Sequence, residues 1–305
     1  MEHLLDRLPS GARIAVIRLR SLGDCVLTTP ALALLKAHRP DLKISVIVEP
    51  RFREVFEGNP DVDEIRATAC RADLALNFHG GTRSMWMTLG SRRRVGFEHH
   101  SMSFLYTDRI PRAQEILGVE RRVHTAEHLA SAMFWMGVPV ADIGRARLFV
   151  TDPVAIARGS VGVTEPRAIA TGSTVVHPFS TRADKTWPAE RFVAVARRVS
   201  NPVILAGPDD DAAPFAEFEV WRNEPLSRVK ALMSGASLFV GNDSGPAHIA
   251  AAFGVPVVAI FGSSDPVTWA PWRTESRVLT SVEGINAISV EEVMHAVSSL
   301  KGVRA

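Results

Sequence analysis

The sequence has only two cysteines among its 305 residues, Cys25 and Cys70. Two cysteines cannot build the disulfide framework of a small secreted domain, and such low usage fits a reducing compartment. The longest nearly apolar run, residues 249–262, is too short to cross a bilayer. The N-terminus carries Glu2 and Asp6 and has no apolar core, so we expect no signal peptide. These absences favour a cytoplasmic protein.

Charge of one sign does not dominate the chain either. Its 35 Lys and Arg face 33 Asp and Glu, for a net charge of +2, which argues against a nucleic-acid-binding surface spread over the whole chain. The division is uneven, with a net charge of +4 over residues 1–150 and −2 over residues 151–305. Nineteen of the 21 basic residues in the first half are arginine, whose forked guanidinium suits carboxylates and phosphates. These arginines either lie on solvent-exposed helix faces or bind an anionic ligand.

What is present is a regular alternation of strand-like and helical stretches. The length suits two domains, and strands alternating with helices predict βαβ units around parallel sheets. Expected strands are residues 13–19, 43–48, 73–78, 94–97, 174–177, 202–206, 237–241 and 255–261. Expected helices are residues 29–38, 124–136, 187–199, 226–234, 245–253 and 289–300. The rhythm fails over residues 138–173, where prolines and glycines accumulate.

We therefore predict an α/β protein with two Rossmann-like domains facing across a cleft. The first covers residues 1–150, a linker region covers residues 151–172, and the second covers residues 173–305. In open parallel sheets, ligands bind beyond the carboxyl ends of the strands. The turns that follow the strands are thus the places to look for chemistry.

Several well-known signatures are missing from those turns. There is no G-x-G-x-x-G fingerprint, which disfavours a dehydrogenase, and no P-loop, nucleophile elbow or zinc-protease motif. The acidic run of residues 209–211 is a metal-binding cluster, a ribose contact or a solvated turn. Glu98, His99 and His100 have no further ligands at metal spacing, so we place them at the surface.

The first turn with candidate chemistry follows the strand at residues 13–19. Asp24 stands there near the start of a helix, and its carboxylate either caps that helix or acts as a base. Cys25 is adjacent, and we expect a small buried residue rather than an activated thiol.

The other two turns lie in the second half. Ser180, Thr181 and Lys185 precede a helix that begins near Trp187, which predicts an anion site suited to a diphosphate, or else an ordinary polar loop. The third turn follows residues 237–241. It offers Asp243, the Ser244 hydroxyl, the Gly245 N–H and His248. Asp243 either caps a helix or holds a basic partner, and His248 is either structural or a phosphate ligand.

Together with two further segments, these turns resemble glycosyltransferase family 9, the ADP-heptose:lipopolysaccharide heptosyltransferase family. The resemblance covers most of the chain and rests on segments that occur in order. They are VIRLRSLGDCVLTTPAL (16–32), DLALNFHGGTRS (73–84) with RRRVGF (92–97), HTAEHLASAMFWMGVP (124–139), HPFSTRADKTWPAERF (177–192) and GNDSGPAHIAAAFGVPVVAIFGSSDP (241–266).

The resemblance implies a GT-B fold with the acceptor on the N-terminal domain and the nucleotide-sugar donor on the C-terminal one. It implies inverting transfer from ADP-L-glycero-D-manno-heptose to a lipopolysaccharide inner-core sugar, with Asp24 as general base and Lys185 stabilising the leaving group. The implied donor contacts are Ser180, Thr181, Lys185, Asp243, Ser244, Gly245 and His248, with Asp210 or Asp211 at the ribose. For the acceptor we expect Ser21, Arg51, Arg53, Arg83 and Arg92.

Lys185, His248, hydroxyls and helix N-termini can stabilise the departing ADP electrostatically, so we expect no metal and no cofactor. A lipid-linked saccharide acceptor implies peripheral contact with the cytoplasmic face of the inner membrane, and we expect no nucleic-acid partner. Two alternatives stay open. One is a GT-B transferase that uses another nucleotide sugar for a different surface glycan, and the other is a catalytically silent nucleotide-sugar-binding module.

Overall fold

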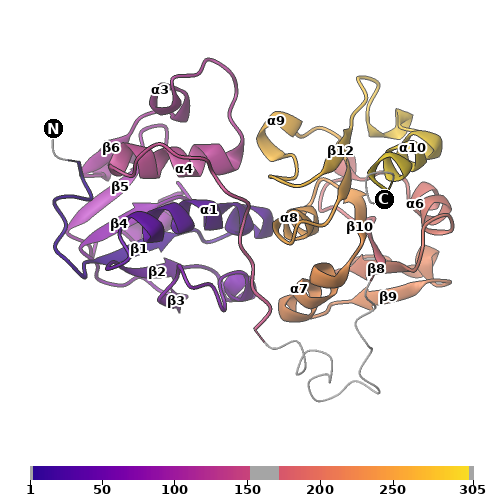
Figure 1. Cartoon of the computed structure of the whole chain (residues 1–305), viewed down its shortest axis with the longest axis horizontal. Helices are drawn as coiled ribbons and strands as arrows, with labels where there is room; N and C mark the ends of the chain where they lie inside the picture. The colour runs from indigo at the N-terminus through magenta and orange to yellow at the C-terminus, as the bar shows by residue number, and fades with distance from the viewer. Residues whose placement is uncertain (1–2, 152–171, 302–305) are drawn as a thin grey trace. The chain divides into compact units, whose positions relative to one another are not determined.

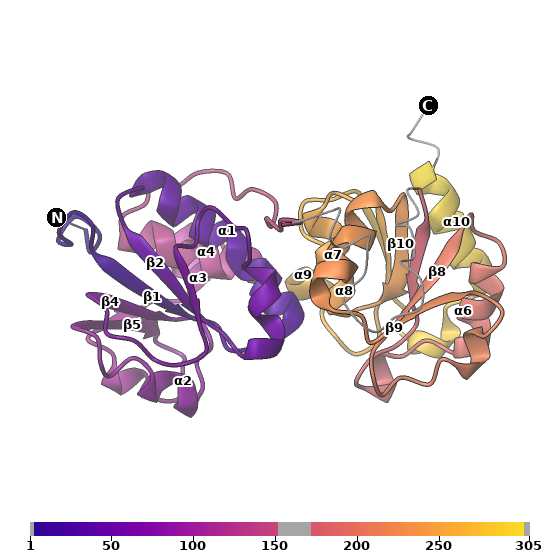
Figure 2. The same cartoon turned by 90° about the horizontal axis from the view of Figure 1, so that it is seen from below.

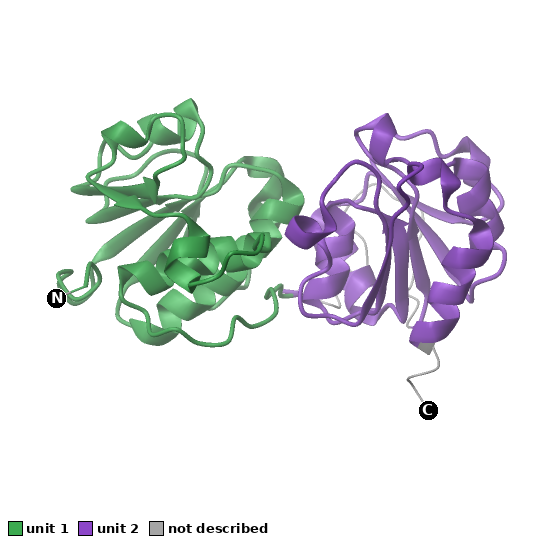
Figure 3. Ribbon diagram, turned by 90° about the horizontal axis from the view of Figure 1, so that it is seen from above, with its two compact units in different colours: residues 1–149 green, residues 150–305 purple. Residues whose placement is uncertain are grey.

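Each half of the chain builds a six-stranded parallel sheet (Figure 1). The computed structural model describes residues 3–151 and 172–301, and its contacts divide the chain into unit 1, residues 1–149, and unit 2, residues 150–305 (Figure 3). The linker region expected at residues 151–172 lies almost wholly outside the described residues. Among the helices that the structure describes, none is both long and apolar enough to span a bilayer.

In unit 1 the strands lie in the order β3-β2-β1-β4-β5-β6. Their bounds are β1 Arg13–Ile17, β2 Lys43–Ile47, β3 Glu64–Arg66, β4 Leu74–Asn77, β5 Arg93–Phe97 and β6 Asp108–Ile110. The helices are α1 Leu22–His38, α2 Thr82–Trp86, α3 Ala113–Leu117 and α4 Thr125–Met136, with short 3₁₀ turns η1 Pro50–Val55 and η2 Ser103–Leu105. Helices α1 and α4 pack together on one face of the sheet, and α2 lies on the other (Figure 2).

In unit 2 the order is β12-β11-β10-β7-β8-β9. The strands are β7 Thr174–His177, β8 Pro202–Ala206, β9 Glu219–Arg222, β10 Leu238–Asn242, β11 Val257–Ile260 and β12 Ser276–Leu279. The helices are α6 Ala189–Ala196, α7 Leu226–Gly235, α8 Gly245–Ala252, α9 Pro266–Trp269 and α10 Val290–Lys301, with 3₁₀ turns η3 Ala183–Lys185, η4 Ala213–Phe215 and η5 Ile285–Ala287. Helices α6 and α10 cover one face, while α7 and α8 cover the other (Figure 2).

The central strands are apolar because helices cover both faces of each sheet. Residues 14–17 of β1 and all of β11 are at most 1% exposed, as parallel sheets require. On the α6 and α10 face of unit 2, Trp187, Phe192 and Phe215 are fully buried in one core cluster, where Trp187 and Phe192 meet edge to face. The Trp187 indole N–H donates to the Ile288 carbonyl at 2.9 Å, so this large side chain is also satisfied as a donor.

Both sheets have the strand order of the Rossmann fold, counted from the first strand of each unit. The chain reverses its direction of travel across the sheet between β1 and β4 in unit 1, and between β7 and β10 in unit 2. The connections that follow two such neighbouring strands run to opposite sides of the sheet. The carboxyl ends of the pair therefore border a crevice, which is where open α/β sheets bind ligands. Each unit has one such switch point.

Helix α1 differs most from its sequence-based prediction. It begins at Leu22, not Thr29, and Pro30 lies inside it rather than at its start. The start is set by a capping box, in which Ser21 is the N-cap and Asp24 is the third helical residue. Asp24 is therefore not the N-cap residue, but its carboxylate does cap the helix, because it accepts the Ser21 N–H as the third residue of the box.

Candidate active site

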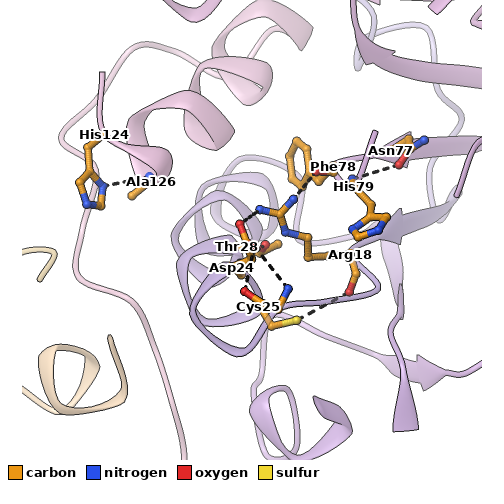
Figure 4. Close-up of polar contacts among 10 residues, drawn as sticks. Arg18, Asp24, Cys25, Thr28, Asn77, Phe78, His79, His124 and Ala126 are labelled. Atoms are coloured by element: carbon orange, nitrogen blue, oxygen red, sulfur yellow. Dashed lines mark hydrogen bonds and ion pairs between the residues drawn. The ribbon is translucent and has the colours of Figure 1, made fainter. Parts of the chain in front are cut away.

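Asp24 stands at the switch point of unit 1, in the turn from β1 into α1. Arg18 follows β1 directly, and its guanidinium donates one hydrogen bond to the Asp24 Oδ1 atom and another to the Phe78 carbonyl beyond β4 (Figure 4). Ser21 donates to the Asp24 Oδ2 atom from its hydroxyl at 3.0 Å and from its backbone N–H at 3.3 Å. Arg18 thus ties together the ends of the two strands that flank the crevice. It fixes the direction of a carboxylate that is still 21% exposed.

Cys25 adjoins this carboxylate but has a different environment. Its side chain is fully buried and its thiol points to the Arg18 carbonyl at 3.7 Å (Figure 4). Burial is the main cause that raises the pKa of the Cys25 thiol to about 12. The expectation of a small buried residue is confirmed, because a thiol with such a pKa supplies almost no nucleophilic thiolate.

The carboxyl end of β4 carries a network that the sequence did not reveal. The Asn77 side-chain oxygen accepts from the N–H groups of His79 and Gly80 at 3.0 and 3.1 Å, while its amide donates to the Tyr106 hydroxyl at 2.9 Å. That hydroxyl also lies 2.9 Å from the Nδ1 atom of His100. Asn77 therefore shapes the turn after β4 and joins it to the turn after β5.

His100 belongs to a cluster of rings at this edge of the sheet. His128 stacks on Phe97 with 4.0 Å between ring centroids, and His99 lies 5.4 Å from both of these rings. Burial lowers the pKa of His100 to about 3 and that of His128 to about 4, so both are neutral at pH 7. Glu98 and His99 are exposed, as expected. The surface placement of His100 is wrong, because its ring sits inside this cluster.

The arginines expected at the acceptor are divided between the two edges of the sheet. Arg51 and Arg83 follow β2 and β4 at the same edge as Asp24, where both pair with Glu49, at 3.0 and 3.6 Å. They are 64% and 67% exposed. Arg53 lies in η1 beside them, held by Glu57 at 3.0 Å.

Arg92 is not brought to this group. It precedes β5 and its backbone N–H bonds to the Ala72 carbonyl before β4, so it lies at the amino edge of the sheet. Arg93 follows it and pairs with Asp108 at 3.0 Å. Arg92 therefore stands at the opposite edge of the sheet from Asp24, Arg51 and Arg83, and the structure does not bring it together with them.

At the switch point of unit 2, Lys185 meets Asp243. Lys185 ends η3 after β7, and its Nζ atom lies 3.0 Å from the Asp243 Oδ2 atom just beyond β10. The Lys185 side chain is 21% exposed and that of Asp243 is 8% exposed. Of the two roles foreseen for Asp243, the structure shows the one in which it holds a basic partner.

The start of α8 adjoins this pair. Ser244 is the N-cap, yet its hydroxyl makes no capping bond, and among the described residues its buried oxygen has no hydrogen-bond partner. Leaving a buried hydroxyl without a hydrogen bond costs free energy. A ligand oxygen that accepts a hydrogen bond from this hydroxyl would remove that cost. His248 is 4% exposed and stands in the first turn of the same helix. Backbone N–H groups at a helix N-terminus, with the Ser244 and His248 side chains beside them, suit phosphate oxygens.

Two serines and a glycine missed by the sequence analysis hold the Lys185 turn in place. The Ser264 hydroxyl donates to the Asp243 carboxylate, and the Ser263 hydroxyl donates to Asp184 at 2.6 Å. A Cβ atom on Gly262 would collide with the backbone of Asp184 and lie 3.0 Å from the Lys185 Cα atom. Only glycine permits this approach, which the G-S-S segment after β11 could have signalled.

The remaining donor candidates are placed less tightly. Ser180 is half-buried, and its hydroxyl accepts weakly from the Arg182 N–H at 3.4 Å. Thr181 is exposed. Beyond β8, Asp210 accepts from the Gly207 N–H at 2.7 Å and Asp211 from the Ala213 N–H at 3.0 Å. Within the described residues, no group of three or more His, Cys, Asp or Glu is arranged to hold a metal ion.

The family model of glycosyltransferase family 9 (heptosyltransferase) matches residues 65–295. The chain belongs to this family. It is therefore a glycosyltransferase of the heptosyltransferase family, and the switch points described above carry the segments by which its sequence resembled that family.

Individual relatives agree with this assignment. Lipopolysaccharide heptosyltransferase 3 of Escherichia coli is 25% identical over 294 residues, with 83% of this chain and 84% of the relative covered. The solved family 9 glycosyltransferase of Veillonella parvula superposes with a TM-score of 0.81 at 22% identity, over 95% of this chain and 97% of the other. An E. coli heptosyltransferase solved with ADP-2-deoxy-2-fluoro heptose superposes with a TM-score of 0.70 at 17% identity, over 94% of this chain and 99% of the other. The fold of the chain is GT-B.

Proposed function

We propose that this enzyme transfers a heptose with inversion from ADP-L-glycero-D-manno-heptose to a lipopolysaccharide inner-core sugar. The proposal rests on the side chains that the structure places at the two switch points. A positioned carboxylate occupies one, and a Lys–Asp pair beside an unpartnered serine and a helix N-terminus occupies the other. Sugar transfer from a nucleotide diphosphate needs both kinds of group. The lipopolysaccharide heptosyltransferases among the relatives support the choice of sugar and acceptor.

The donor diphosphate is assigned to unit 2. Lys185, Ser180, Thr181, the Ser244 hydroxyl and the Gly245 N–H supply donors for phosphate oxygens, and His248 stands in the same turn. Lys185 is paired with Asp243, and the diphosphate would share this cation with the aspartate. Asp210 and Asp211 remain the candidates for the ribose. These groups stabilise the charge that develops on departing ADP, so we propose a reaction that needs no metal.

The acceptor hydroxyl loses its proton to Asp24 as it attacks the anomeric carbon. Inversion follows from a single in-line displacement, in which the new glycosidic bond forms as the bond to the ADP oxygen breaks. General-base catalysis of this kind typically contributes about 10²- to 10⁴-fold in rate. Arg18 and Ser21 donate to both carboxylate oxygens, which orients Asp24. Arg51, Arg53 and Arg83 lie at the same edge and suit the carboxylates and phosphates of an inner-core acceptor.

The test starts with nucleotide binding. Calorimetry with ADP, UDP, GDP and CDP, each with and without EDTA, should show ADP bound selectively and EDTA without effect. Preference for another nucleotide would favour the transferase with a different donor. Binding without transfer to any core-deficient lipopolysaccharide would favour the silent binding module.

Asp24→Asn then tests the base. The amide keeps the size of the side chain but cannot accept the hydroxyl proton, so we expect transfer to fall at least about 10²-fold while ADP affinity stays unchanged. Asp6→Asn, at an exposed position near the N-terminus, is the matched control and should retain full activity. Full activity of Asp24→Asn would remove this residue from the mechanism.

A further inference from the structure

Helix α2 and the turn that follows it carry large apolar side chains toward solvent. Trp86 is 59% exposed and Leu89 is 45% exposed, whereas Ser84, Met85 and Thr88 between and beside them are buried. Residues three apart lie on one side of a helical turn, and backbone bonds continue the turn through Leu89. The exposed side of this segment therefore presents a tryptophan and a leucine side by side.

Exposed arginines flank this segment at both ends. Arg83 precedes Trp86 by three residues and is 67% exposed. Arg92 follows Leu89 by three residues and is also exposed. An ideal Cβ atom on Gly90 would lie 3.8 Å from the Arg71 Cγ atom, so this arginine runs beside the end of the turn. We call the surface formed by Arg71, Arg83, Trp86, Leu89 and Arg92 the α2 face.

Few acidic groups offset this charge. Glu49 lies 3.6 Å from Arg83 but also pairs with Arg51. Near the other end, Asp73 accepts the Arg13 N–H at 2.8 Å, and Asp108 pairs with Arg93. Within the part of the chain that the structure describes, Arg71 and Arg92 form no ion pair. The α2 face is thus a basic surface around an exposed indole.

The α2 face belongs to one side of the sheet of unit 1. Helix α2 lies on the opposite side of the sheet from α1 and α4 (Figure 2). The next connection, from β5 to β6, carries Phe104 with 67% of its surface exposed. Consecutive right-handed crossovers fall on one side of a sheet, so Phe104 adds to the apolar character of that side.

We propose that the α2 face docks unit 1 onto a bilayer surface that carries anionic lipid headgroups. Indole rings settle at the boundary between headgroups and acyl chains, and arginine binds headgroup phosphates while its stem covers apolar surface. Each basic residue near an anionic leaflet strengthens binding further, and reversible attachment needs few of them. This proposal rests on the proposed function in one respect: a lipid-linked acceptor is held in the membrane, so an enzyme that uses it must reach the membrane surface.

The test is sedimentation of the full chain with vesicles of phosphatidylethanolamine and phosphatidylglycerol, compared with phosphatidylcholine vesicles. We expect binding to the anionic vesicles that falls at least about tenfold in Trp86→Ser/Leu89→Ser. Arg92→Gln should lower vesicle binding several-fold. Salt at 0.5 M should also weaken binding, because the electrostatic screening length, about 8 Å at physiological salt, becomes shorter. Val282→Ser, which alters a fully exposed valine in unit 2, is the matched control and should bind like the unaltered chain.

Two further measurements separate the outcomes. All variants should bind ADP equally and should transfer equally to a delipidated soluble acceptor, which shows that both units are intact. The double variant should lose transfer only to acceptor embedded in vesicles. Absence of vesicle binding by the unaltered chain, or unchanged binding by the double variant, would overturn the docking proposal. So would a dimer that the double variant disrupts with no vesicle binding in either form, because the α2 face would then meet a second copy. Vesicle binding without any sugar transfer would overturn the proposed function alone.

Discussion

Arg18 is the residue on which the geometry of the candidate base depends. Its side chain is 9% exposed, and it bridges Asp24 at the start of α1 to the Phe78 carbonyl beyond β4. A guanidinium donates to these two groups from different nitrogens of a rigid planar fork, a geometry that the single ammonium nitrogen of lysine does not reproduce. Arg18 is therefore a positioning residue: it acts on the acceptor hydroxyl only through the direction in which it holds Asp24.

We expect Arg18→Lys to keep the positive charge but lose the bridge. The turnover number kcat should fall about 10- to 100-fold, since misplacing a reacting group by about 1 Å can cost as much. Donor affinity should stay unchanged because the donor contacts are assigned to unit 2. Steady-state kinetics with calorimetry of ADP binding separates these quantities. Arg20→Gln, two residues away and exposed, is the control. Equal kcat values for Arg18→Lys and the unaltered enzyme would show that Asp24 needs no such support.

At the scale of the element, α1 shows how a helix accommodates an internal proline. Pro30 has no N–H to donate to the Val26 carbonyl, four residues earlier. The Thr29 hydroxyl donates to that carbonyl at 2.8 Å instead, and its oxygen accepts the Arg147 N–H at 2.8 Å. One buried hydroxyl thus satisfies two backbone groups. It joins α1 to the segment that leaves unit 1.

Thr29→Val should therefore destabilise the protein by about 1–3 kcal/mol, the usual cost of leaving buried polar groups without partners. Valine has nearly the same shape, so the loss would report on hydrogen bonding rather than on packing. Urea unfolding followed by circular dichroism measures the change, and Thr29→Ser, which keeps the hydroxyl, should recover most of the stability. A Thr29→Val protein as stable as the unaltered one would mean that water replaces the hydroxyl.

The same helix shows what could be predicted from the sequence. The buried central strands and the turns of Asp24, Lys185 and Ser244 were located correctly, because apolar runs followed by polar turns mark the carboxyl ends of parallel strands. The start of α1 was misplaced because Pro30 was taken as a first-turn residue, whereas Ser21 and Asp24 form the capping box. The edge strands β3, β6, β9 and β12 were missed because each is short and only partly buried.

Contacts that depend on tertiary structure could not be predicted at all. No spacing in the sequence connects Arg18 to Phe78, Ser264 to Asp243, or His100 to Tyr106, because sheet order brings these pairs together. Arg92 is the converse case. Its place among the expected acceptor residues came from composition, and only the direction of β5 shows that it lies at the other edge.

At the scale of the whole molecule, the histidine cluster makes folding depend on pH. Burial lowers the pKa of His128 to about 4 and that of His100 to about 3, below the value of about 6.5 for a free histidine. The groups facing them are mostly cationic when charged, namely Arg18, His79 and His99, and the carboxylate of Glu98 acts only on His99. Between pH 6.5 and 4 the unfolded chain therefore binds more protons than the folded one, and the free energy of unfolding falls as the pH falls.

We expect His100 and His128 to contribute a slope of about 1–2 kcal/mol per pH unit from pH 6.5 to 5, before most carboxylates titrate, given at most about 1.4 kcal/mol per pH unit for each proton. His177 in unit 2, whose pKa burial also lowers to about 4, adds to the measured slope. Urea unfolding at several pH values measures it. His128→Gln removes one of the two protons and should flatten the slope by up to about 1 kcal/mol per pH unit. His38→Gln, at the end of α1 and outside the cluster, should not. A slope that His128→Gln leaves unchanged would mean that the cluster does not cause the acid sensitivity. That sensitivity would then be assigned to His177 and to carboxylates such as Asp63, whose pKa is lowered in the folded state despite its partial burial.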